Sequence, residues 1–443
     1  MVVGLNHRTA PLAMRERFWI SENRRYEALR LLKSAEGIAE VLVISTPCRT
    51  EFLLWADDPT LAVNSLVQYL SAEHGLRLSD WEHFYRRLDD AALAHVFRLA
   101  CSLDCLMLCG SDVVTNLTLA WEQARAVGAA GPYLNALLGK ALETAQRVLE
   151  ETAIGRLSVS LPGAVLDLAR RIFGSLEGRK VLLLGAGTVS ESSARLMVDE
   201  GARSVVVIDQ SPARAQEVAQ RLGGTSASLA DRWQSLLHAD IVISASGCPH
   251  VVLTREEAER IAAERNRVAL VIMDIGMPRD VDPEARRVDG ILLYDLEGLE
   301  RAVRTHAGEH ASATAAAEKI AAAEAQIFRS QLHAETVVST VVGLRRRLEE
   351  ICRQELESFT QERGPFTREQ DQLLHAITTQ VTQRIASSLV HELKELPERE
   401  EQERMAATVA RLFHLDSPPQ ALAGSKWDKG KNETTERAIA INS

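Results

Sequence analysis

The pattern of apolar and polar residues changes twice along the chain, and it predicts three regions of different architecture. Residues 1 to about 145 mix short apolar runs with stretches whose apolar residues recur at helical spacing. This mixture is expected of a compact N-terminal α/β domain, 1–145. The runs that we expect to form strands are Val2 to Leu5, Val41 to Ser45 and Glu51 to Trp55.

In the second region, residues 146–300, short and fully apolar runs each lead into a polar loop, with helical patterns between them. Strands without polar alternation are typical of a parallel sheet whose two faces are covered by helices. The expected strands are residues 180–184, 204–208, 241–244, 269–274 and 290–294. Their spacing predicts a Rossmann-type, doubly wound parallel sheet.

In the third region, residues 301–416, strand-like runs disappear. An Ala-rich helical stretch, residues 311–326, passes into a long segment whose apolar residues keep helical spacing. A helical region without a catalytic motif is most simply an oligomerisation domain. Residues 417–443 are rich in Pro, Lys, Asn, Thr and Ser, and we expect them to form a disordered tail.

The composition limits where the chain works and what it binds. No apolar run approaches the roughly 18 residues of a membrane span. Charged residues interrupt the N-terminal stretch, where a secretory signal would lie. We therefore expect a cytoplasmic protein. A net charge of −10 argues against general adhesion to nucleic acid. Arg345-Arg346-Arg347 is a local basic cluster, but Glu349 and Glu350 follow at helical spacing, which favours an ion-paired, solvated face.

The six cysteines lack the paired two-residue spacing of zinc sites. Cys101, Cys105 and Cys109 are four residues apart and would form one column if they lay on a helix. Packing on a buried helix face explains that spacing better than a metal does, and no metal site is predicted.

A glycine turn stands between the first strand and the following helix of the second region. The turn consists of Gly185, Ala186, Gly187, Thr188, Val189 and Ser190. Such a turn lets the backbone approach a pyrophosphate, and the helix N-terminus adds a positive dipole. Ser190 replaces the third glycine of the usual fingerprint. Asp209 ends the next strand, where a carboxylate favours NAD over NADP. The pattern predicts a dinucleotide site.

Two N-terminal stretches carry the strongest indications of chemistry. They are Gly4-Leu5-Asn6-His7-Arg8-Thr9-Ala10-Pro11 and Ser45-Thr46-Pro47-Cys48-Arg49-Thr50-Glu51. The second places a thiol beside a guanidinium, an arrangement suited to covalent capture of an acyl group that bears a carboxylate. His95 lies among apolar residues at helical spacing, where a histidine is normally a satisfied core residue.

These stretches resemble the N-terminal signature of the glutamyl-tRNA reductase family, whose usual forms are Gly-Leu-Asn-His-Arg-Thr-Ala-Pro and Ser-Thr-Cys-Asn-Arg-Thr-Glu. The likeness continues to about residue 415. It implies that a cysteine thioester of the glutamyl group is reduced by NADPH to glutamate-1-semialdehyde, the first step of tetrapyrrole synthesis by the five-carbon route. It also implies a homodimer formed by the helical domain, glutamyl-tRNA as substrate, and glutamate-1-semialdehyde aminomutase as a candidate partner.

The resemblance gives roles to individual residues. Cys48 is the candidate nucleophile and His95 its catalytic neighbour. Substrate binding is expected of Thr46, Arg49, Asp112 and Asn116. The Cys105–Thr118 segment, however, has lost most of the polar residues that are usual in the family. Asp209-Gln210 stands where Asn-Arg is usual, so NADH is an alternative to NADPH unless Arg203 or Arg214 binds the 2′-phosphate.

One departure affects the nucleophile. Pro47 stands in the place of the family's cysteine, and Cys48 in the place of its asparagine. On extended chain, a shift of one residue moves a side chain to the opposite face, so we expect Cys48 to work only if Pro47 bends the loop. Three functions follow: an active reductase, a catalytically silent relative that keeps the dimer and tRNA or partner binding, and an unrelated dehydrogenase.

Overall fold

The computed structural model describes residues 1–415 except 57, 106–109, 153, 155–159, 304–306 and 397–398. It divides into two compact units: Met1–Ala129 with Ala141–Ala322, and Ala130–Lys140 with the chain from Ala323 onward. The tail that the sequence predicts at 417–443 lies outside the described residues.

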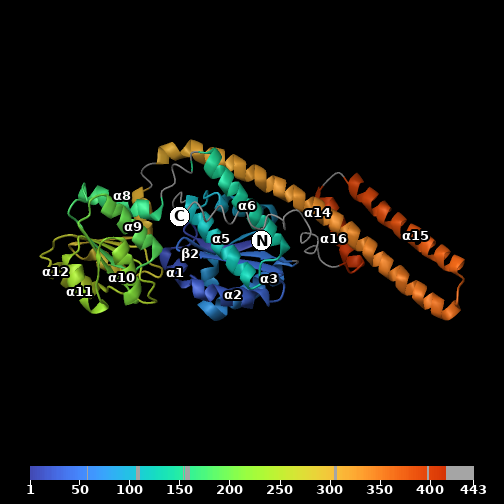
Figure 1. The fold of residues 1–443 in the computed structure, drawn as a ribbon, viewed down its shortest axis with the longest axis horizontal. Helices are drawn as coiled ribbons and strands as arrows, with labels where there is room; N and C mark the ends of the chain where they lie inside the picture. Colours follow the sequence, from blue (N-terminus) through green and yellow to red (C-terminus); the bar gives the residue numbers. More distant parts are fainter. Residues whose placement is uncertain are drawn as a thin grey trace. The chain divides into compact units, whose positions relative to one another are not determined.

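An antiparallel sheet forms the core of the N-terminal region (Figure 1). Its strands are β1 (Val2–Asn6), β2 (Glu40–Thr46), β3 (Arg49–Trp55) and β4 (Tyr85–Arg87), in the order β2-β3-β1-β4. The three predicted strands are confirmed. β4 was not predicted, because its three residues, Tyr-Arg-Arg, carry no apolar alternation.

Two helices, α2 and α5, pack on β2, and α4 contacts β4. The described helices of the region are α1 (Leu12–Arg17), α2 (Glu22–Lys33), α3 (Pro59–His74), α4 (Asp89–Ala100), α5 (Gly110–Ala126) and α6 (Pro132–Glu151). The prediction that Cys101, Cys105 and Cys109 share one helix is wrong for the first two, because α4 ends at Ala100 and Cys105 lies in a bend beyond it. Cys109 lies outside the described residues.

The second sheet is parallel, with strand order β10-β9-β8-β5-β6-β7. The strands are β5 (Lys180–Leu184), β6 (Ser204–Ile208), β7 (Thr225–Ser226), β8 (Ile241–Ser244), β9 (Leu270–Asp274) and β10 (Ile291–Asp295). The order reverses between β5 and β8, as in the doubly wound dinucleotide-binding fold. The five predicted strands are confirmed, whereas the two-residue β7 was missed.

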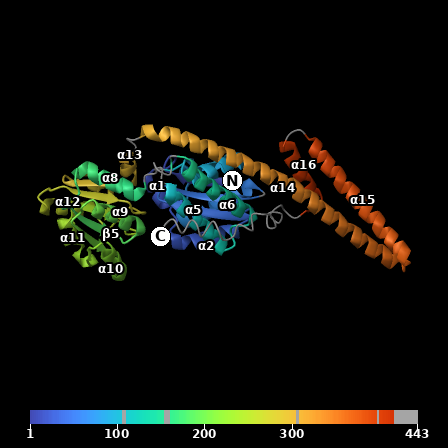
Figure 2. The same ribbon diagram turned by 45° about the horizontal axis from the view of Figure 1, so that its top comes forward.

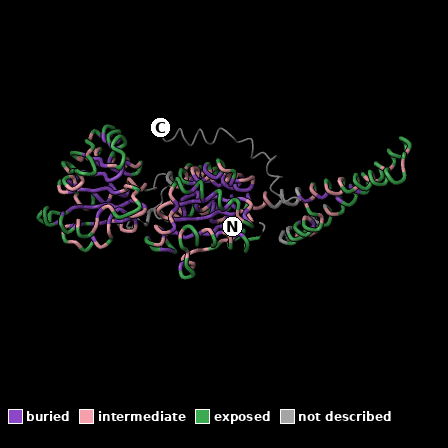
Figure 3. Tube along the Cα trace, turned by 90° about the horizontal axis from the view of Figure 1, so that it is seen from below, coloured by how far each residue is buried: buried purple, intermediate pink, exposed green. Residues whose placement is uncertain are grey.

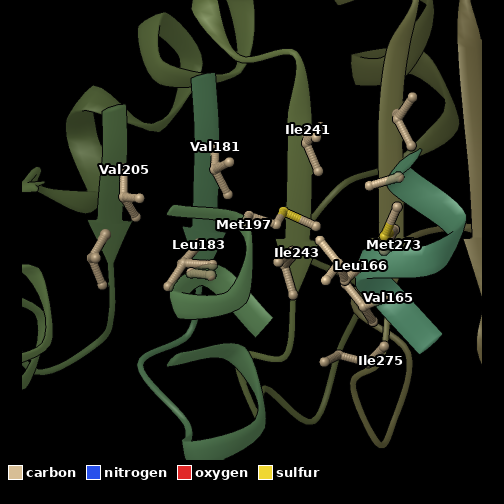
Figure 4. Close-up of a cluster of buried hydrophobic side chains, with 14 of the residues drawn as sticks. Val165, Leu166, Val181, Leu183, Met197, Val205, Ile241, Ile243, Met273 and Ile275 are labelled. Atoms are coloured by element: carbon tan, nitrogen blue, oxygen red, sulfur yellow. The ribbon is translucent and has the colours of Figure 1, made fainter. Parts of the chain in front are cut away.

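Alternate residues of the longer parallel strands enter cores on opposite faces. Val181 and Leu183 join the core drawn in Figure 4, whereas Leu182 and Leu184 join the core on the other face. Figure 2 shows helices on both sides of this sheet. They are α8 (Leu161–Phe173), α9 (Thr188–Asp199), α10 (Pro212–Arg221), α11 (Arg232–His238), α12 (Arg255–Glu264) and α13 (Leu296–Val303). Burial on both faces explains why these strands contain almost no polar residues.

The C-terminal region is entirely helical where it is described, as predicted. It comprises α14 (Ala307–Arg363), α15 (Arg368–Glu395) and α16 (Arg399–Leu412). Figure 3 colours most of the α15 trace as exposed. The basic cluster on α14 is ion-paired as expected, through Arg345–Glu349 at 2.9 Å and Arg347–Glu350 at 3.3 Å. Among the described helices, none combines the length and the apolar character that crossing a bilayer demands.

Candidate active site

The first motif forms the turn that leads from β1 to α1. Asn6 Oδ1 accepts hydrogen bonds from the backbone N–H groups of Arg8 (2.9 Å) and Thr9 (3.3 Å), and Thr9 Oγ1 accepts one from the N–H of Asn6 (3.1 Å). An Asx turn of this kind needs a short side-chain acceptor at its first residue. The motif therefore fixes the path of the chain beside the end of the sheet.

The second motif is a tight β-hairpin. Thr46 and Arg49 are the last paired residues of β2 and β3, so Pro47 and Cys48 are the two central residues of the turn. Alternation between two faces holds for extended chain and does not apply within a two-residue turn. The argument that a shift of one residue turns Cys48 to the opposite face therefore does not apply to this turn, and the role of Cys48 as nucleophile stays a prediction.

Both carbonyl groups of the turn are held by residues outside the hairpin. The backbone N–H of His7 donates to the carbonyl of Cys48 at 2.9 Å, and Arg15 Nη1 donates to the carbonyl of Pro47 at 2.6 Å. Cys48 itself is half-buried and outside any disulfide. The first motif and α1 thus fix the backbone on either side of the thiol.

Beside the turn lies a buried network of charges centred on Glu51. Arg49 Nη1 donates to Glu51 Oε1 at 2.6 Å, His95 Nε2 lies 3.1 Å from Glu51 Oε2, and the hydroxyl of Tyr85 donates to Glu51. Burial opposes ionisation of Glu51, but Arg49 and then His95 outweigh it and lower the pKa of the carboxyl to about 2. Burial likewise opposes the charge of Arg49, but Glu51 raises its pKa. Both shifts favour the ionised form of the pair.

Gly4 makes this network possible. Gly4 on β1 is paired with Glu51 on β3 and with Tyr85 on β4, so the three residues form one row across the sheet. A Cβ at position 4 would lie 2.5 Å from the carbonyl oxygen of Thr50 and 2.8 Å from Glu51 Cγ. Because Gly4 has no side chain, the Tyr85 hydroxyl can reach across β1 to Glu51.

Asp104 closes the other side of the network. Its carboxylate lies 2.9 Å from Arg8 Nη1 and 3.4 Å from Arg49 Nη1, and its backbone carbonyl accepts a hydrogen bond from Arg49 Nη2. Arg49 is only 3% exposed, so it faces these partners rather than open solvent.

The ligand atoms of Glu51, His95 and Asp104 lie within 4.8 Å of one another, close enough for a metal ion. Arg49 bonds to both carboxylates and Arg8 to Asp104, however, and these guanidinium groups supply the positive charge that a metal would bring. The arrangement therefore fits an ion-pair network better than a metal centre.

His7 is neutral beside this cluster. Burial, then the charges of Arg49 and Arg8, lower the pKa of His7 to about 4. Two other thiols of the region are poor nucleophiles, because burial raises the pKa of Cys101 and of Cys105 to about 12. After burial, the charges of Arg49 and Cys48 have the largest influence on the pKa of Cys105, so this thiol lies near the turn.

The remaining predicted substrate residues lie on α5. Asp112 and Asn116 are four residues apart on this helix and thus belong to one face. Asn116 is exposed, and the side chain of Asp112 lies outside the described residues. Thr46 is half-buried at the end of β2.

The glycine turn between β5 and α9 has the form that a dinucleotide pyrophosphate requires. Gly185 has φ +106°, and a Cβ there would lie 2.1 Å from the carbonyl oxygen of Ala245, so only glycine fits. At Gly187 an added Cβ would meet no atom within 4 Å, which leaves the N-terminus of α9 open to an anion. Thr188 and Val189 are exposed there, whereas Ala186 and Ser190 are buried. These residues fit the cofactor.

Asp209 stands at the end of β6, next to this turn. Its Oδ2 accepts a hydrogen bond from the N–H of Ala186 and its Oδ1 one from the N–H of Ser211, both at 2.8 Å. The carboxylate therefore clamps the glycine turn and places a negative charge where the adenosine ribose would bind. Arg203 and Arg214 are both exposed.

Sequence reasoning gave no role to Glu51, Asp104, Tyr85 and Arg15. Glu51 could have been found, because Arg49 and Glu51 are two apart on a strand and share a face. Tyr85, Asp104 and Arg15 come from segments far apart in the sequence, and no local pattern relates them to the thiol.

Three family models match consecutive parts of the chain. The model of the glutamyl-tRNA(Glu) reductase N-terminal domain matches residues 3–152, and that of its dimerisation domain matches residues 316–415. Between them, the model of shikimate / quinate 5-dehydrogenase matches residues 167–302.

Relatives match along most of their length. The chain is 32% identical over 435 residues to glutamyl-tRNA reductase 2 of Koribacter versatilis, covering 98% of this chain and 97% of that protein. It is 35% identical over 421 residues to glutamyl-tRNA reductase of Desulforudis audaxviator, covering 94% and 93%. Among solved structures, glutamyl-tRNA reductase from Methanopyrus kandleri has a TM-score of 0.53 at 24% identity, covering 94% of this chain and 98% of that one, and supports the fold.

Proposed function

The chain belongs to the glutamyl-tRNA reductase family, and we propose that it reduces glutamyl-tRNA(Glu) to glutamate-1-semialdehyde with NADPH, through a thioester on Cys48. This reaction is the first step of tetrapyrrole (porphyrin and haem) biosynthesis by the five-carbon route. The observation that carries the proposal is the clamped hairpin turn, which holds half-buried Cys48 directly before Arg49, whose guanidinium lies in the buried network with Glu51 and Asp104.

In the proposed first step, the sulfur of Cys48 attacks the carbonyl carbon of the glutamyl ester. A C–S bond forms, the C–O bond to the tRNA ribose breaks, and the thiol proton passes to the ribose oxygen. A thioester suits the second step because sulfur overlaps poorly with the carbonyl and leaves its carbon electrophilic. NADPH, when bound, would supply the hydride that reduces this thioester to the aldehyde; the sulfur of Cys48 would then leave as a thiolate and take a proton from solvent.

The buried network positions the substrate. We assign Arg49 to the carboxylate of the glutamyl group, a charge-assisted contact that replaces one of its contacts with Asp104. Asp104 keeps Arg8 as a cationic partner when this happens. Thr46, Asp112 and Asn116 are assigned to the polar groups of the same substrate. His95, held by Glu51, is the group that moves a proton in this cluster.

We assign the cofactor pyrophosphate to the turn from Gly185 to Ser190 and to the N-terminus of α9. The carboxylate of Asp209 would accept hydrogen bonds from the ribose hydroxyl groups of a dinucleotide, but its negative charge would repel a 2′-phosphate. NADPH is what the family implies, and NADH is the cofactor that Asp209 favours, so both belong in the assay.

A catalytically silent relative is the second candidate, and two observations favour it. Pro47 stands where the family has its nucleophile, and Arg49 is already bound on two sides by Glu51 and Asp104. Such a protein would keep the dimer and the binding of tRNA or of glutamate-1-semialdehyde aminomutase without turnover.

One experiment separates the two candidates. The purified protein is incubated with glutamyl-tRNA and either NADPH or NADH, and semialdehyde and a glutamyl adduct on Cys48 are measured, the adduct by mass spectrometry. We expect both signals, and we expect Cys48→Ser to abolish both. Cys352→Ser, in α14, is the matched control and should keep them. Binding of glutamyl-tRNA without adduct or product would establish the silent relative instead.

We further propose that the protein is a cytoplasmic homodimer assembled through its dimerisation domain. A row of apolar residues on α15 supports this. Leu373, Ile377, Val381 and Ile385 are four residues apart and are between 44% and 62% exposed. A second copy would cover this row.

A further inference from the structure

Arg15 bonds to two segments far from it in sequence, the thiol turn and the nucleotide-binding domain. It lies on α1 and is 2% exposed. Its Nη1 donates to the carbonyl of Pro47 at 2.6 Å, and its Nη2 donates to Glu297 Oε1 at 2.9 Å. Glu297 belongs to the first turn of α13, directly after β10. One guanidinium group therefore bonds both to Pro47, the residue next to Cys48, and to the parallel-sheet domain.

The rest of α1 is docked on the same domain. Leu12 is buried within the core that contains Met277 and Leu296, and its N–H donates to Glu297 Oε1 at 3.0 Å. Glu16 accepts three hydrogen bonds from Arg279, one from the backbone N–H at 2.8 Å and two from the guanidinium at 2.7 Å each. α1 is thus attached at both ends, and Arg15 lies between these attachments.

The attachment falls on one half of the carboxyl edge of the parallel sheet. The glycine turn follows β5 and Asp209 follows β6, so the adenosine half of a dinucleotide belongs to that side. Arg279 follows β9 and Glu297 follows β10, on the other side of the point where the strand order reverses. A dinucleotide that crosses this point places its nicotinamide on the half to which α1 is attached.

We propose that Arg15 is a positioning residue that holds the Pro47–Cys48 turn in register with the nicotinamide half of the nucleotide domain. The inference rests on the proposed function, because register matters only if an acyl group on Cys48 accepts a hydride. Hydride transfer requires the reacting atoms within about 3.5 Å, and a misplacement of about 1 Å costs on the order of 100-fold in rate.

The chemistry of arginine suits this task better than it suits packing. An ion pair with one exposed partner, such as Arg15–Glu297, adds little to stability, and Arg15 Nε is buried without a hydrogen-bond partner in the described structure. The planar fork of a guanidinium can bond to two fixed acceptors at once. A lysine has a single nitrogen on a flexible stem and cannot reproduce that span.

The test uses the full chain and three variants. Arg15→Lys keeps the charge but loses the fork, and Glu297→Ala removes the acceptor on the nucleotide domain while leaving the bond to Pro47. Glu297 has a side chain 40% exposed, so its loss should leave the fold intact. The control is Arg17→Ala, also on α1, because Arg17 contacts only His74, Gly75 and Asp80 among polar groups of the described N-terminal region.

Single-turnover measurements follow the Cys48 adduct by mass spectrometry and the aldehyde separately, and the Kd for NADPH is measured by fluorescence. We expect Glu297→Ala and Arg15→Lys to slow aldehyde formation by about 10- to 100-fold. In Glu297→Ala the adduct should form at the normal rate and accumulate, and Kd should change by less than about threefold. Aldehyde formation at the wild-type rate in both variants would overturn the proposal, and so would an equal effect of Arg17→Ala.

Hydrogen exchange provides a readout that does not need activity. Loss of the link should speed exchange of the His7 amide, which bonds to the Cys48 carbonyl, in Arg15→Lys but not in Arg17→Ala. If the wild-type protein forms no adduct, the proposed function fails, while this measurement still decides whether Arg15 holds the turn. Unchanged exchange at His7 would show that it does not.

Discussion

Replacing Gly4 by alanine tests how the charged network beside Cys48 is built. The added Cβ would lie 2.5 Å from the carbonyl oxygen of Thr50 and 2.8 Å from both Cα and Cγ of Glu51. Two of these three atoms belong to the backbone, so a side-chain rotation cannot relieve the contacts. β1 and β3 must separate, and the new methyl group occupies the space through which the Tyr85 hydroxyl reaches Glu51.

The expected cost has two sources. Forcing a methyl group into a packed site costs about 1–3 kcal/mol. Losing the hydrogen bond from the Tyr85 hydroxyl to the charged carboxylate of Glu51 costs about 1–3 kcal/mol more. Because one displacement produces both effects, we expect Gly4→Ala to lower the free energy of unfolding by about 2–5 kcal/mol. Displacement of Glu51 should also weaken its bonds to Arg49 and His95 and reduce adduct formation on Cys48.

The assay is equilibrium unfolding in urea, compared with Gly187→Ala. At Gly187 the φ is −78° and an added Cβ meets nothing within 4 Å, so alanine there should change stability by less than about 1 kcal/mol. Tyr85→Phe removes the hydroxyl without adding bulk and should reproduce only the hydrogen-bond part of the loss. A Gly4→Ala protein as stable as the Gly187→Ala protein would refute the packing argument, whatever its activity.

Three other predictions concern the dimer, the nucleotide domain and the cofactor. Ile377→Lys places a charge in the exposed apolar row of α15 and should convert the dimer to monomers in analytical ultracentrifugation, whereas Thr379→Lys on the same helix should not. Burial raises the pKa of Asp274 from 3.8 to about 7, so the stability it contributes is fully present below about pH 4 and is lost as the pH rises through 7. The difference in free energy of unfolding between wild type and Asp274→Asn should change between pH 5 and pH 8, and a constant difference would contradict the assigned cause. Asp209→Asn keeps an acceptor for the Ala186 N–H but removes the negative charge. The ratio of kcat/KM for NADPH to kcat/KM for NADH should therefore rise by about 3- to 10-fold at low salt. An unchanged ratio would exclude Asp209 as the residue that discriminates between the two cofactors.

Much of the fold follows from local pattern. The strands β5, β6 and β8 have the predicted bounds. Their polar residues, Lys180, Ser204 and Ser244, stand only at strand ends, because burial on both faces leaves no polar residue inside them. The two short strands, β4 and β7, were missed because their partners stabilise them rather than their own sequence. Tyr85, which pairs with Gly4, lies in a segment without a clear pattern of apolar and polar residues. β7 has only two residues, too few to show the alternation that predicts a strand.

The site was predicted less completely, for a related reason. The local motif pointed to Cys48 and Arg49, and the family resemblance to His95, but the groups that surround them come from separate segments. Asp104 follows α4, Tyr85 lies on β4 and Arg15 lies on α1. A sequence shows which side chains are present, whereas the sheet register and the helix packing decide which of them meet.

The position of the thiol shows how much depends on that register. Treated as extended chain, the change from a cysteine at position 47 to one at position 48 reverses the face of the side chain. In the structure, strand pairing ends at Thr46 and Arg49, so both positions belong to the turn and neither has a strand face. Neither Pro47 nor Cys48 has the positive φ that the twist-matched primed turns require. The turn is instead held from outside, by His7 at one carbonyl and Arg15 at the other. These two contacts fix the backbone on either side of the thiol, so we expect loss of the Arg15 contact to affect Cys48 more than a change elsewhere on α1 does.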